Sequence, residues 1–297
     1  MRTKLTMRQP GSVTRSAPAS RTRTSDLISM GVINALLLLL VLATAIPYIY
    51  MASSAFKENS EIFGTPLTLL PRHATLDNMR DLLSQFPYAR WYVNTAIVAT
   101  VGTLLSVLLA SLGGFAFAKY DFRFKNVLFT LMLAVILIPF QVLLVPQFRI
   151  IKALGWFNTY QALIVPGAVS AFGIFLMRQY TLGVPDELLD AARIDGASEF
   201  GLWWRVVLPL VRPGLAVLAI LSFTGLWNDF FWPMIVTTKT SMFVLNLGIA
   251  ALVGPYDYKY GILLSGALLA SLPVIIVFLI FQRQFIEGLT AGALKGA

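Results

Sequence analysis

The chain of 297 residues contains no cysteine and a single histidine, His73. Without cysteine it can have no disulfide framework, no thiolate metal site and no cysteine nucleophile. A lone histidine also removes most zinc and iron ligation schemes. The sequence therefore predicts no metal site and no catalytic residue, and it argues against metalloenzymes and thiol enzymes.

Charged residues are also scarce. They make up 12% of the chain, whereas hydrophobic residues make up 57% and the mean hydropathy is +0.75. An average globular protein has about 25% charged and roughly 45–50% apolar residues. This chain cannot cover a water-facing surface with polar groups, so its main solvent is the lipid bilayer.

Six apolar stretches are long enough to cross a bilayer, which needs roughly 20 residues of helix because unpaired backbone groups are not tolerated in hydrocarbon. None of the six contains lysine or arginine. They cover residues 28–50, 92–118, 127–148, 160–177, 214–236 and 262–281. We therefore predict an all-α integral membrane protein with six transmembrane helices in a single domain, 28–285.

The basic residues predict the orientation of these spans. Residues 1–27 combine lysine and arginine with serine, threonine and proline, a mix typical of a disordered arm. With that arm inside, 15 of the 23 basic residues face the cytoplasm and eight face outward. The bias predicts cytoplasmic termini in a bacterial or archaeal plasma (inner) membrane. The formal net charge of +9 then reflects topology, and we expect no nucleic-acid partner.

The first span has an alternative interpretation as a secretory signal peptide, because a basic region precedes it and Ala43-Thr44-Ala45 resembles a cleavage site. Its apolar run covers residues 28–50, which is longer than the roughly 7–15 residues of a signal peptide core. We therefore expect a retained membrane helix.

Two connections are long. The outer one, 51–91, contains three prolines and several acids, and it is either a solvated loop or a docking surface. The inner one, 178–213, is not apolar enough to span and not polar enough to be disordered. We expect it to fold at the membrane surface. Residues 286–297 are predicted to form a cytoplasmic tail.

The inner loop carries helix signals. Pro185 and the following acids open a short helix, where a missing donor does no harm and negative charge suits the dipole. Gly196 is a candidate left-handed C-cap. Ser198 can cap a second helix, which we expect Leu208 and Pro209 to end.

The first of these helices carries an exposed stripe of small side chains. Leu188, Ala191, Ala192 and Asp195 fall at i, i+3, i+4 and i+7, so they share one face. Such a face suits insertion into a groove of another protein. The alternative is an interfacial helix lying on lipid headgroups.

At this loop the chain resembles the inner-membrane permeases of binding-protein-dependent ABC importers. Their cytoplasmic pattern is E-A-A, three residues, G, nine residues, I-x-L-P. Here it reads Asp190-Ala191-Ala192, Gly196, Val206, Leu208 and Pro209, with every spacing kept. Asp190 replaces the glutamate and Val206 the isoleucine, so the acidic and the branched apolar character remain. Segments 227–233 and 281–296 look like the carbohydrate-uptake branch, in particular the maltose-transporter permease with the short chain.

The resemblance implies the ABC importer permease fold and a permease subunit for sugar import. Its implied partners are a second homologous permease, two ATPase subunits and an extracytoplasmic sugar-binding protein. The chain has no G-x-x-x-x-G-K-[ST] loop, so we expect no cofactor of its own, with ATP and Mg handled by the ATPase subunits. The loop helix would be the coupling helix. The implied coupling residues are Asp186, Glu187, Leu188, Asp190, Ala191, Ala192, Asp195 and Gly196. A second implied ATPase contact is Glu287, Gly288, Thr290 and Gly292 in the tail, with a frayed terminus as the alternative.

Polar groups inside the predicted spans are candidates for the translocation pathway. An acid at such depth is expensive, so Asp229 should face protein or water. A helix–helix hydrogen bond is the alternative role. The candidate pathway residues are Asn94, Gln141, Trp227, Asn228 and Asp229.

Two other functions compete. A secondary transporter or channel could use Asp229 as its coupling acid, but the chain shows no repeat or second buried acid to match. A membrane-embedded transferase would need clustered proton-handling residues near one headgroup plane, which the sequence does not offer. The sequence does not specify which sugar is carried.

Overall fold

The computed structural model describes residues 24–252 and 259–293, with side chains over 29–252 and 259–282. Within these ranges the secondary structure is entirely helical. The predicted basic arm falls mostly on residues 1–23, which lie outside the described residues, as do residues 294–297 of the predicted tail. The helix α1 already begins at Thr24, four positions before the expected start of the first span at Ile28.

The chain divides into two units, residues 1–49 and 50–297. Most of α1 (Thr24–Ser54) belongs to the first unit. Its large apolar side chains from Met30 to Ile46 are all more than half exposed. A helix that is apolar on every side fits a lipid environment, as predicted for the first span.

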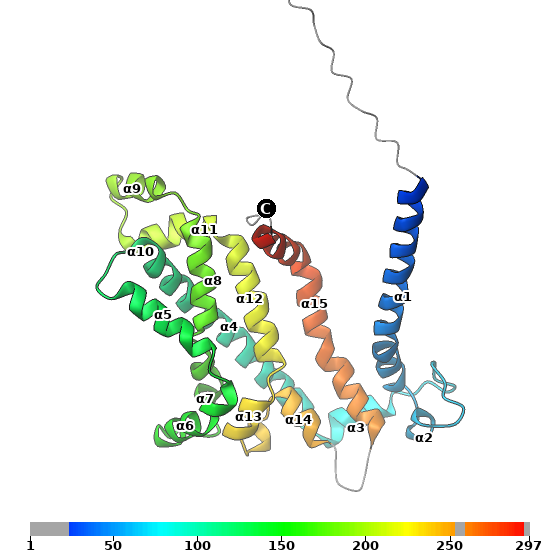
Figure 1. The fold of residues 1–297 in the computed structure, drawn as a ribbon. Helices are drawn as coiled ribbons and strands as arrows, with labels where there is room; N and C mark the ends of the chain where they lie inside the picture. Colours follow the sequence, from blue (N-terminus) through cyan, green and yellow to red (C-terminus); the bar gives the residue numbers. More distant parts are fainter. Residues whose placement is uncertain (1–23, 253–258, 294–297) are drawn as a thin grey trace, which may run out of the picture. The chain divides into compact units, whose positions relative to one another are not determined.

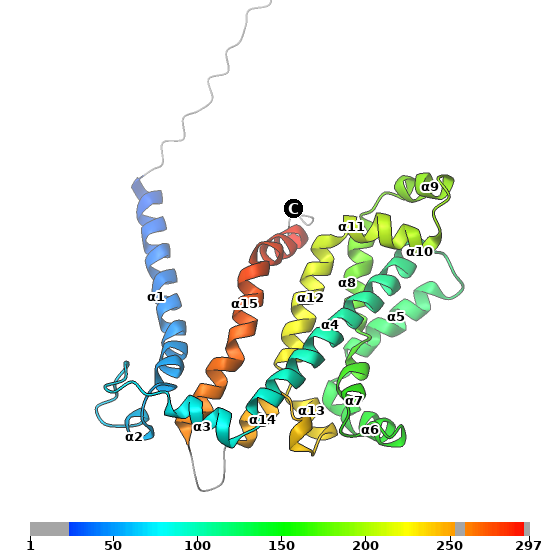
Figure 2. The same ribbon diagram turned by 180° about the vertical axis from the view of Figure 1, so that it is seen from behind.

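The second unit is built on four helices that pack side by side (Figures 1 and 2). The helix α4 packs against α8 and α12, and α12 also packs against α15. Their bounds are α4 (Tyr88–Lys119), α8 (Ala171–Leu182), α12 (Arg212–Trp227) and α15 (Tyr260–Ala293). The predicted second and sixth spans lie within α4 and α15.

Shorter helices occupy the two ends of this unit (Figure 1). At one end lie α9 (Asp186–Ile194), α10 (Glu199–Gly201) and α11 (Leu208–Leu210). At the other lie α3 (Asp77–Gln85), α13 (Phe231–Val236) and α14 (Leu245–Ala251). The remaining helices are α2 (Asn59–Ile62), α5 (Lys125–Ile136), α6 (Phe140–Ala153) and α7 (Tyr160–Ile164).

Glycines allow the long helices to approach closely. A Cβ at Gly114 of α4 would lie 2.6 Å from the Cβ of Met177 and 2.7 Å from the backbone nitrogen of Arg178 on α8. A Cβ at Gly214 of α12 would lie 2.5 Å from the ring of Tyr180. Small residues at helix interfaces let backbones pack tightly in membranes, where van der Waals contact replaces the hydrophobic effect.

The third span, predicted over 127–148, is broken and does not form one continuous helix. The chain forms α5 and α6, which meet at an angle of 103°. Pro139 precedes α6 with an extended backbone (φ −57°, ψ 132°). A proline has no N–H to donate and disfavours helix at the residue before it, so the helix ends although the apolar run continues.

The fifth span also ends earlier than predicted. The helix α12 stops at Trp227, and α13 is a separate short helix, so residues 214–236 are not continuous. Asn228 is the C-cap of α12, and its backbone N–H donates to the carbonyl of Thr224. Asp229 accepts a hydrogen bond from the backbone nitrogen of Trp232 at 3.4 Å, so it serves the start of α13.

The fourth span is bent by 44° where a turn of 3-10 helix at Val165–Gly167 follows α7 and precedes α8. Among the described residues, three helices are long and apolar enough to cross a membrane alone, and up to six spans result if each bent pair counts as one.

The first part of the predicted outer loop folds onto the start of α15. The buried amide of Asn78 donates to the carbonyls of Ala55 at 3.2 Å and Lys57 at 2.7 Å. Ser265 of α15 donates to the same Ala55 carbonyl at 3.2 Å. Buried backbone carbonyls require such partners, so this region is a folded cap.

We predict that Gly114→Ala destabilises the contact between α4 and α8. The added methyl group would meet backbone atoms that cannot move aside, and overpacking of this kind costs about 1–3 kcal/mol. The expected result is a lower unfolding temperature of the purified protein. The control is Gly225→Ala on α12, where a Cβ would meet nothing within 4 Å. Equal unfolding temperatures for both variants would contradict the packing argument.

Candidate functional site

The helix α9 forms where the loop sequence predicted it. Pro185 precedes it with an extended backbone, and Asp186 and Glu187 lie in its first turn. Leu189 is buried in a core formed with residues of α4, α8 and α12. That burial fixes which side of α9 faces the bundle.

The exposed side of α9 carries most of the predicted coupling residues. Leu188 is 45% exposed. The other exposed members are Asp186, Glu187, Asp190, Ala191, Asp195 and Gly196. Ala192 is the exception to the predicted stripe, because it is half-buried and packs against the core around Leu189. Leu189 and Ala192 are three residues apart, so they share the buried face of the helix.

Gly196 ends α9 with a Schellman motif. Its φ of +84° lies in the left-handed region, which confirms the predicted conformation. Its backbone nitrogen donates to the carbonyl of Arg193 at 3.0 Å, and that of Ala197 donates to Ala192 at 2.9 Å. These two bonds satisfy carbonyls at the helix end. Ser198 then caps α10 by accepting from the backbone nitrogen of Gly201 at 3.2 Å.

The second loop helix continues beyond the predicted end at Leu208 and Pro209. A π-helical segment over Leu202–Val207 joins α10 to α11, and the chain turns by 84° into α12. Pro209 lies in α11, which follows the π-helical segment without a gap, and the helix ends at Leu210. Pro209 therefore lies near the end of this helix and does not interrupt it.

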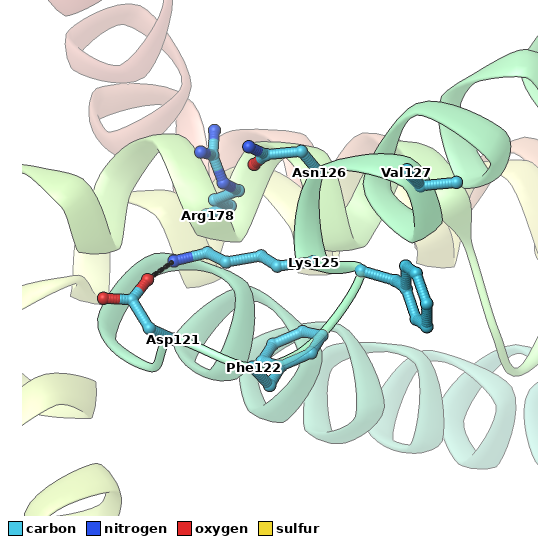
Figure 3. A pocket seen from close by; sticks show the side chains of 7 residues that line it. Asp121, Phe122, Lys125, Asn126, Val127 and Arg178 are labelled. Atoms are coloured by element: carbon cyan, nitrogen blue, oxygen red, sulfur yellow. Dashed lines mark hydrogen bonds and ion pairs between the residues drawn. The ribbon is translucent and has the colours of Figure 1, made fainter.

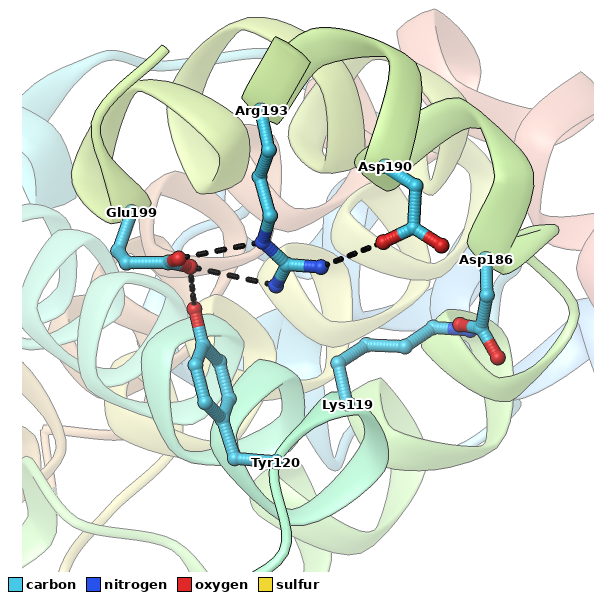
Figure 4. A network of polar contacts seen from close by, with 6 residues as sticks. All are labelled: Lys119, Tyr120, Asp186, Asp190, Arg193 and Glu199. Carbon is cyan, nitrogen blue, oxygen red and sulfur yellow. Dashed lines mark hydrogen bonds and ion pairs between the residues drawn. The ribbon is translucent and has the colours of Figure 1, made fainter. Parts of the chain in front are cut away.

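A network of polar side chains ties the loop to the end of α4 (Figure 4). Lys119 donates to Asp186 at 2.6 Å and to the carbonyl of Val184 at 2.5 Å. The Tyr120 hydroxyl donates to Glu199. Both residues at the end of α4 therefore hold the loop, one at each side of α9.

Arg193 closes the network from within the loop. Its Nε donates to Glu199 at 3.2 Å, and its Nη1 donates to Asp190 at 2.9 Å. Asp190, the first residue of the loop pattern, is therefore ion-paired within its own helix. Figure 4 shows the guanidinium between the two carboxylates.

The network shifts the protonation of its members. Hydrogen bonds from the Tyr120 hydroxyl and then from Arg193 hold the pKa of Glu199 below its ordinary value. Burial, followed by the hydrogen bond to Glu199, raises the pKa of Tyr120. Glu199 is thus held as a carboxylate.

The sequence did not identify Lys119, Tyr120, Arg193 and Glu199 as site residues. The spacing of Asp190 and Arg193 at i and i+3 was a usable signal. Lys119 and Tyr120 lie more than sixty residues before their partners. A single sequence holds no signal that pairs them.

Two candidate pathway residues are structural ties in this conformation. Asn94 is buried, donates to the carbonyls of Ser241 and Phe243 at 2.9 and 2.8 Å, and accepts from the Tyr160 hydroxyl at 2.7 Å. Trp227 is 4% exposed and donates to the carbonyl of Ala270 at 3.0 Å. Their polar groups are thus engaged by protein.

The other three candidates lie at the breaks between helices. Asn228 is exposed and Asp229 half-buried between α12 and α13, and Gln141 is exposed in the first turn of α6. The helices α6 and α13 pack together, with the rings of Phe140 and Trp232 6.2 Å apart. The structure therefore places Gln141 on α6, and Asn228 and Asp229 in the connection that leads into the adjoining α13.

The predicted tail contact lies on α15. The backbone of Glu287, Gly288, Thr290 and Gly292 is helical. Their side chains are outside the described residues. Among the residues that the structure does describe, no group of three or more His, Asp or Glu side chains could hold a metal ion.

We predict that Glu199→Gln loosens the loop. Because the folded state lowers the pKa of Glu199, its contribution to loop stability is fully present above the carboxyl's ordinary pKa and is lost as the pH falls through the lowered value. Amide hydrogen exchange across α9 should be several-fold faster in the variant at neutral pH, and this difference should shrink in acid. The control is Glu187→Gln on the same helix. A difference between wild type and Glu199→Gln that is independent of pH would exclude the charge of Glu199 as the cause.

Comparisons with known proteins agree with this architecture. The family model of binding-protein-dependent transport system inner membrane components matches residues 102–290. The arabinooligosaccharides transport system permease protein AraQ of Halalkalibacterium halodurans is 40% identical over 84% of this chain and 91% of its own. The lactose transport system permease protein LacG of Rhizobium radiobacter is 30% identical over 91% of this chain and 96% of its own.

Solved structures show the same fold. A chain of a bacterial ABC transporter involved in the import of the acidic polysaccharide alginate superposes with a TM-score of 0.78 at 25% identity, covering 88% of this chain and 98% of that one. The extent of these matches, together with the loop pattern, identifies the chain as a member of the family of binding-protein-dependent transport system inner membrane components.

Proposed function

We propose that the chain is the permease subunit of an ATP-driven importer for short oligosaccharides, with arabinose oligosaccharides as its substrate class. The observation that carries this proposal is the 40% identity to the AraQ permease over 84% of the chain. A second AraQ, from Bacillus subtilis, is 37% identical. Relatives named for lactose and diacetylchitobiose, each at 30% identity, favour the wider class of short oligosaccharides.

In this proposal the end that carries α9 faces the cytoplasm, and both termini lie on that side. The support is the distribution of lysine and arginine, because positively charged loops remain inside. The opposite end, with α3 and the folded cap around Asn78, would then face the extracytoplasmic sugar-binding protein. A solved relative of the same fold is an alginate transporter in complex with its periplasmic protein.

The permease depends on other chains for energy. It has no phosphate-binding loop of the type G-x-x-x-x-G-K-[ST], so two ATPase subunits bind and hydrolyse ATP with Mg. Half of the translocation pathway comes from this chain and half from a second, homologous permease. The chain itself is not an enzyme.

The coupling helix of this proposal is α9, whose exposed side docks on an ATPase subunit. Asp186 of α9 binds Lys119, and Arg193 of α9 binds Glu199, which also accepts from Tyr120. Displacement of α9 therefore moves the end of α4. At the far end, Asn94 joins α4 to the carbonyls of Ser241 and Phe243. Movement at one end is thereby passed to the other, as alternating access by rigid-body motion requires.

The translocation pathway of this proposal uses Gln141, Asn228 and Asp229 as its polar contacts. These residues are exposed or half-buried at helix breaks, where irregular backbone in a membrane lines a protein- or water-filled space. Asn94 and Trp227 hold the neighbouring helices in place through their hydrogen bonds. Glu287, Gly288, Thr290 and Gly292 provide the second ATPase contact.

We predict that Gly196→Leu abolishes coupling without preventing membrane insertion. A side chain of this kind at a φ of +84° is strained by about 1–2 kcal/mol, which would unwind the Schellman turn. Sugar uptake and co-purification of the ATPase subunits should both fall strongly.

The matched control is Gly196→Asn, because asparagine tolerates the left-handed conformation. A Cβ at this position would meet nothing within 4 Å, so crowding within the chain is not the cause. Normal uptake by Gly196→Leu would refute the docking assignment. Loss of uptake in both variants would show that the ATPase subunit tolerates no side chain at position 196.

We predict that arabinose oligosaccharides raise ATP turnover of the complete transporter with its binding protein in liposomes. Arabinose monomer and the acidic oligosaccharides of alginate are the comparison ligands. Stimulation by the arabinose oligosaccharides alone is the expected outcome. Equal turnover with and without every sugar would contradict the importer function, whereas stimulation by another sugar would correct only the substrate.

A further inference from the structure

A cavity with excess positive charge lies at the corner between α4 and α5. Its volume is about 350 Å³, and its lining includes Asp121, Lys125, Asn126 and Arg178 (Figure 3). Figure 3 shows Arg178 beside Asn126, with Lys125 reaching from the start of α5 towards Asp121. None of these residues takes part in the coupling network or in the proposed pathway.

The charges in this cavity do not balance. The side chain of Lys125 is 19% exposed and pairs with Asp121 at 3.2 Å, but that carboxylate is fully exposed to solvent. Arg178 donates through Nε to the carbonyl of Phe117 at 3.2 Å and lies over the ring of Phe129 at 4.4 Å. Neither contact is with an anion, so neither offsets the positive charge of Arg178. Two cations with one carboxylate leave a net positive charge that suits an anion.

The backbone adds donors to the same place. The helix α5 begins at Lys125, and Phe124 before it has a φ of 65° and gives no side-chain cap. The backbone amides of Lys125 and Leu128 donate to the carbonyls of Phe122 and Phe124 at 3.2 and 2.9 Å. Those of Asn126 and Val127 have no partner within the helix, and they lie at the positive end of its dipole. With Lys125 and Arg178 they form a set of donors of the kind that binds phosphate.

The walls of the cavity indicate which phosphate compound it takes. Phe122, Phe124 and Val127 are 41%, 60% and 56% exposed around the cationic centre. An inorganic phosphate has no apolar group to contact such walls, whereas a phospholipid has acyl chains next to its headgroup. Basic pockets between helices on the cytoplasmic side of a membrane suit anionic lipid headgroups.

We propose that this cavity binds the phosphate of an anionic phospholipid of the cytoplasmic leaflet. Lys125, Arg178 and the backbone amides of Asn126 and Val127 hold the phosphate, and Phe122 and Phe124 contact the acyl chains. The choice of leaflet rests on the orientation given under the proposed function. The binding of an anionic phospholipid follows from the charges and apolar walls of the cavity and does not depend on that orientation.

The test counts lipids bound to the detergent-solubilised transporter complex by native mass spectrometry. The probe is dioleoylphosphatidylglycerol, with dioleoylphosphatidylcholine as the zwitterionic comparison and inorganic phosphate as a competitor. One basic residue near an anionic lipid contributes about 1 kcal/mol, which corresponds to about a fivefold change in binding. Lys125→Gln should therefore bind about fivefold less phosphatidylglycerol.

Asp121→Asn is the opposing variant. It removes the one carboxylate that competes for Lys125, so it should raise phosphatidylglycerol binding by about fivefold. This gain cannot arise from misfolding. The matched control is Lys152→Gln, an exposed lysine in the last turn of α6, which should leave binding unchanged.

Several results would overturn the proposal. Equal loss in Lys125→Gln and Lys152→Gln would show a nonspecific charge effect, and reduced binding in Asp121→Asn would contradict the charge argument. Displacement of the lipid by millimolar inorganic phosphate would assign the cavity to free phosphate. Unchanged lipid counts with loss of the ATPase subunits from Lys125→Gln would assign it to a protein contact. Sugar-stimulated ATP turnover of the same preparations reports on the proposed function independently of the lipid counts.

Discussion

The close contact between α4 and α8 determines how the second unit can move. At Gly114 the two backbones approach so closely that no side chain fits between them, which leaves little freedom for one helix to slide past the other. The helix α4 has 32 residues and is therefore about 48 Å long at 1.5 Å per residue. Lys119 and Tyr120 hold the α9 loop at one end of this rod, and Asn94 holds the segment before α14 near the other. A displacement at either end reaches the other through packed atoms.

The helix breaks are the complement of that rigid rod. In hydrocarbon every backbone polar group needs a partner, so a helix cannot end unless protein or water takes over its hydrogen bonds. At the start of α13 the Asp229 carboxylate accepts from the backbone N–H of Trp232. At the start of α6 Pro139 has no backbone N–H, so no acceptor is needed there. The two breaks adjoin because α6 and α13 pack on each other. Gln141 and Asn228 are exposed next to these breaks. In the proposed function they offer hydrogen-bonding partners to the hydroxyl groups of a sugar.

The features that the sequence predicted correctly are those encoded within a few neighbouring residues. Apolar length alone predicted α4 and α15, and the order of proline, acids and glycine predicted α9 with its left-handed cap at Gly196. Apolar length did not locate the breaks at Pro139 and Asp229, because hydropathy stays high across them and does not show where the helical hydrogen bonds stop. Ala192 was misplaced for a related reason. Which face of a short helix is buried depends on which side chain packs into the core. In α9 that side chain is Leu189, so Ala192 is turned towards the core as well.

The corner between α4 and α5 connects the two proposed binding sites, which no motif of the sequence links. Tyr120 holds Glu199 of the coupling loop, and five residues later Lys125 begins α5 and lines the cationic cavity. Arg178 of the same cavity is, with Met177, one of the two residues of α8 that lie closest to Gly114. A phosphate bound between Lys125 and Arg178 would link the start of α5 to α8, next to the connection that follows α4. In the two proposals, a lipid headgroup and an ATPase subunit would therefore act on neighbouring residues of one short segment, 119–125.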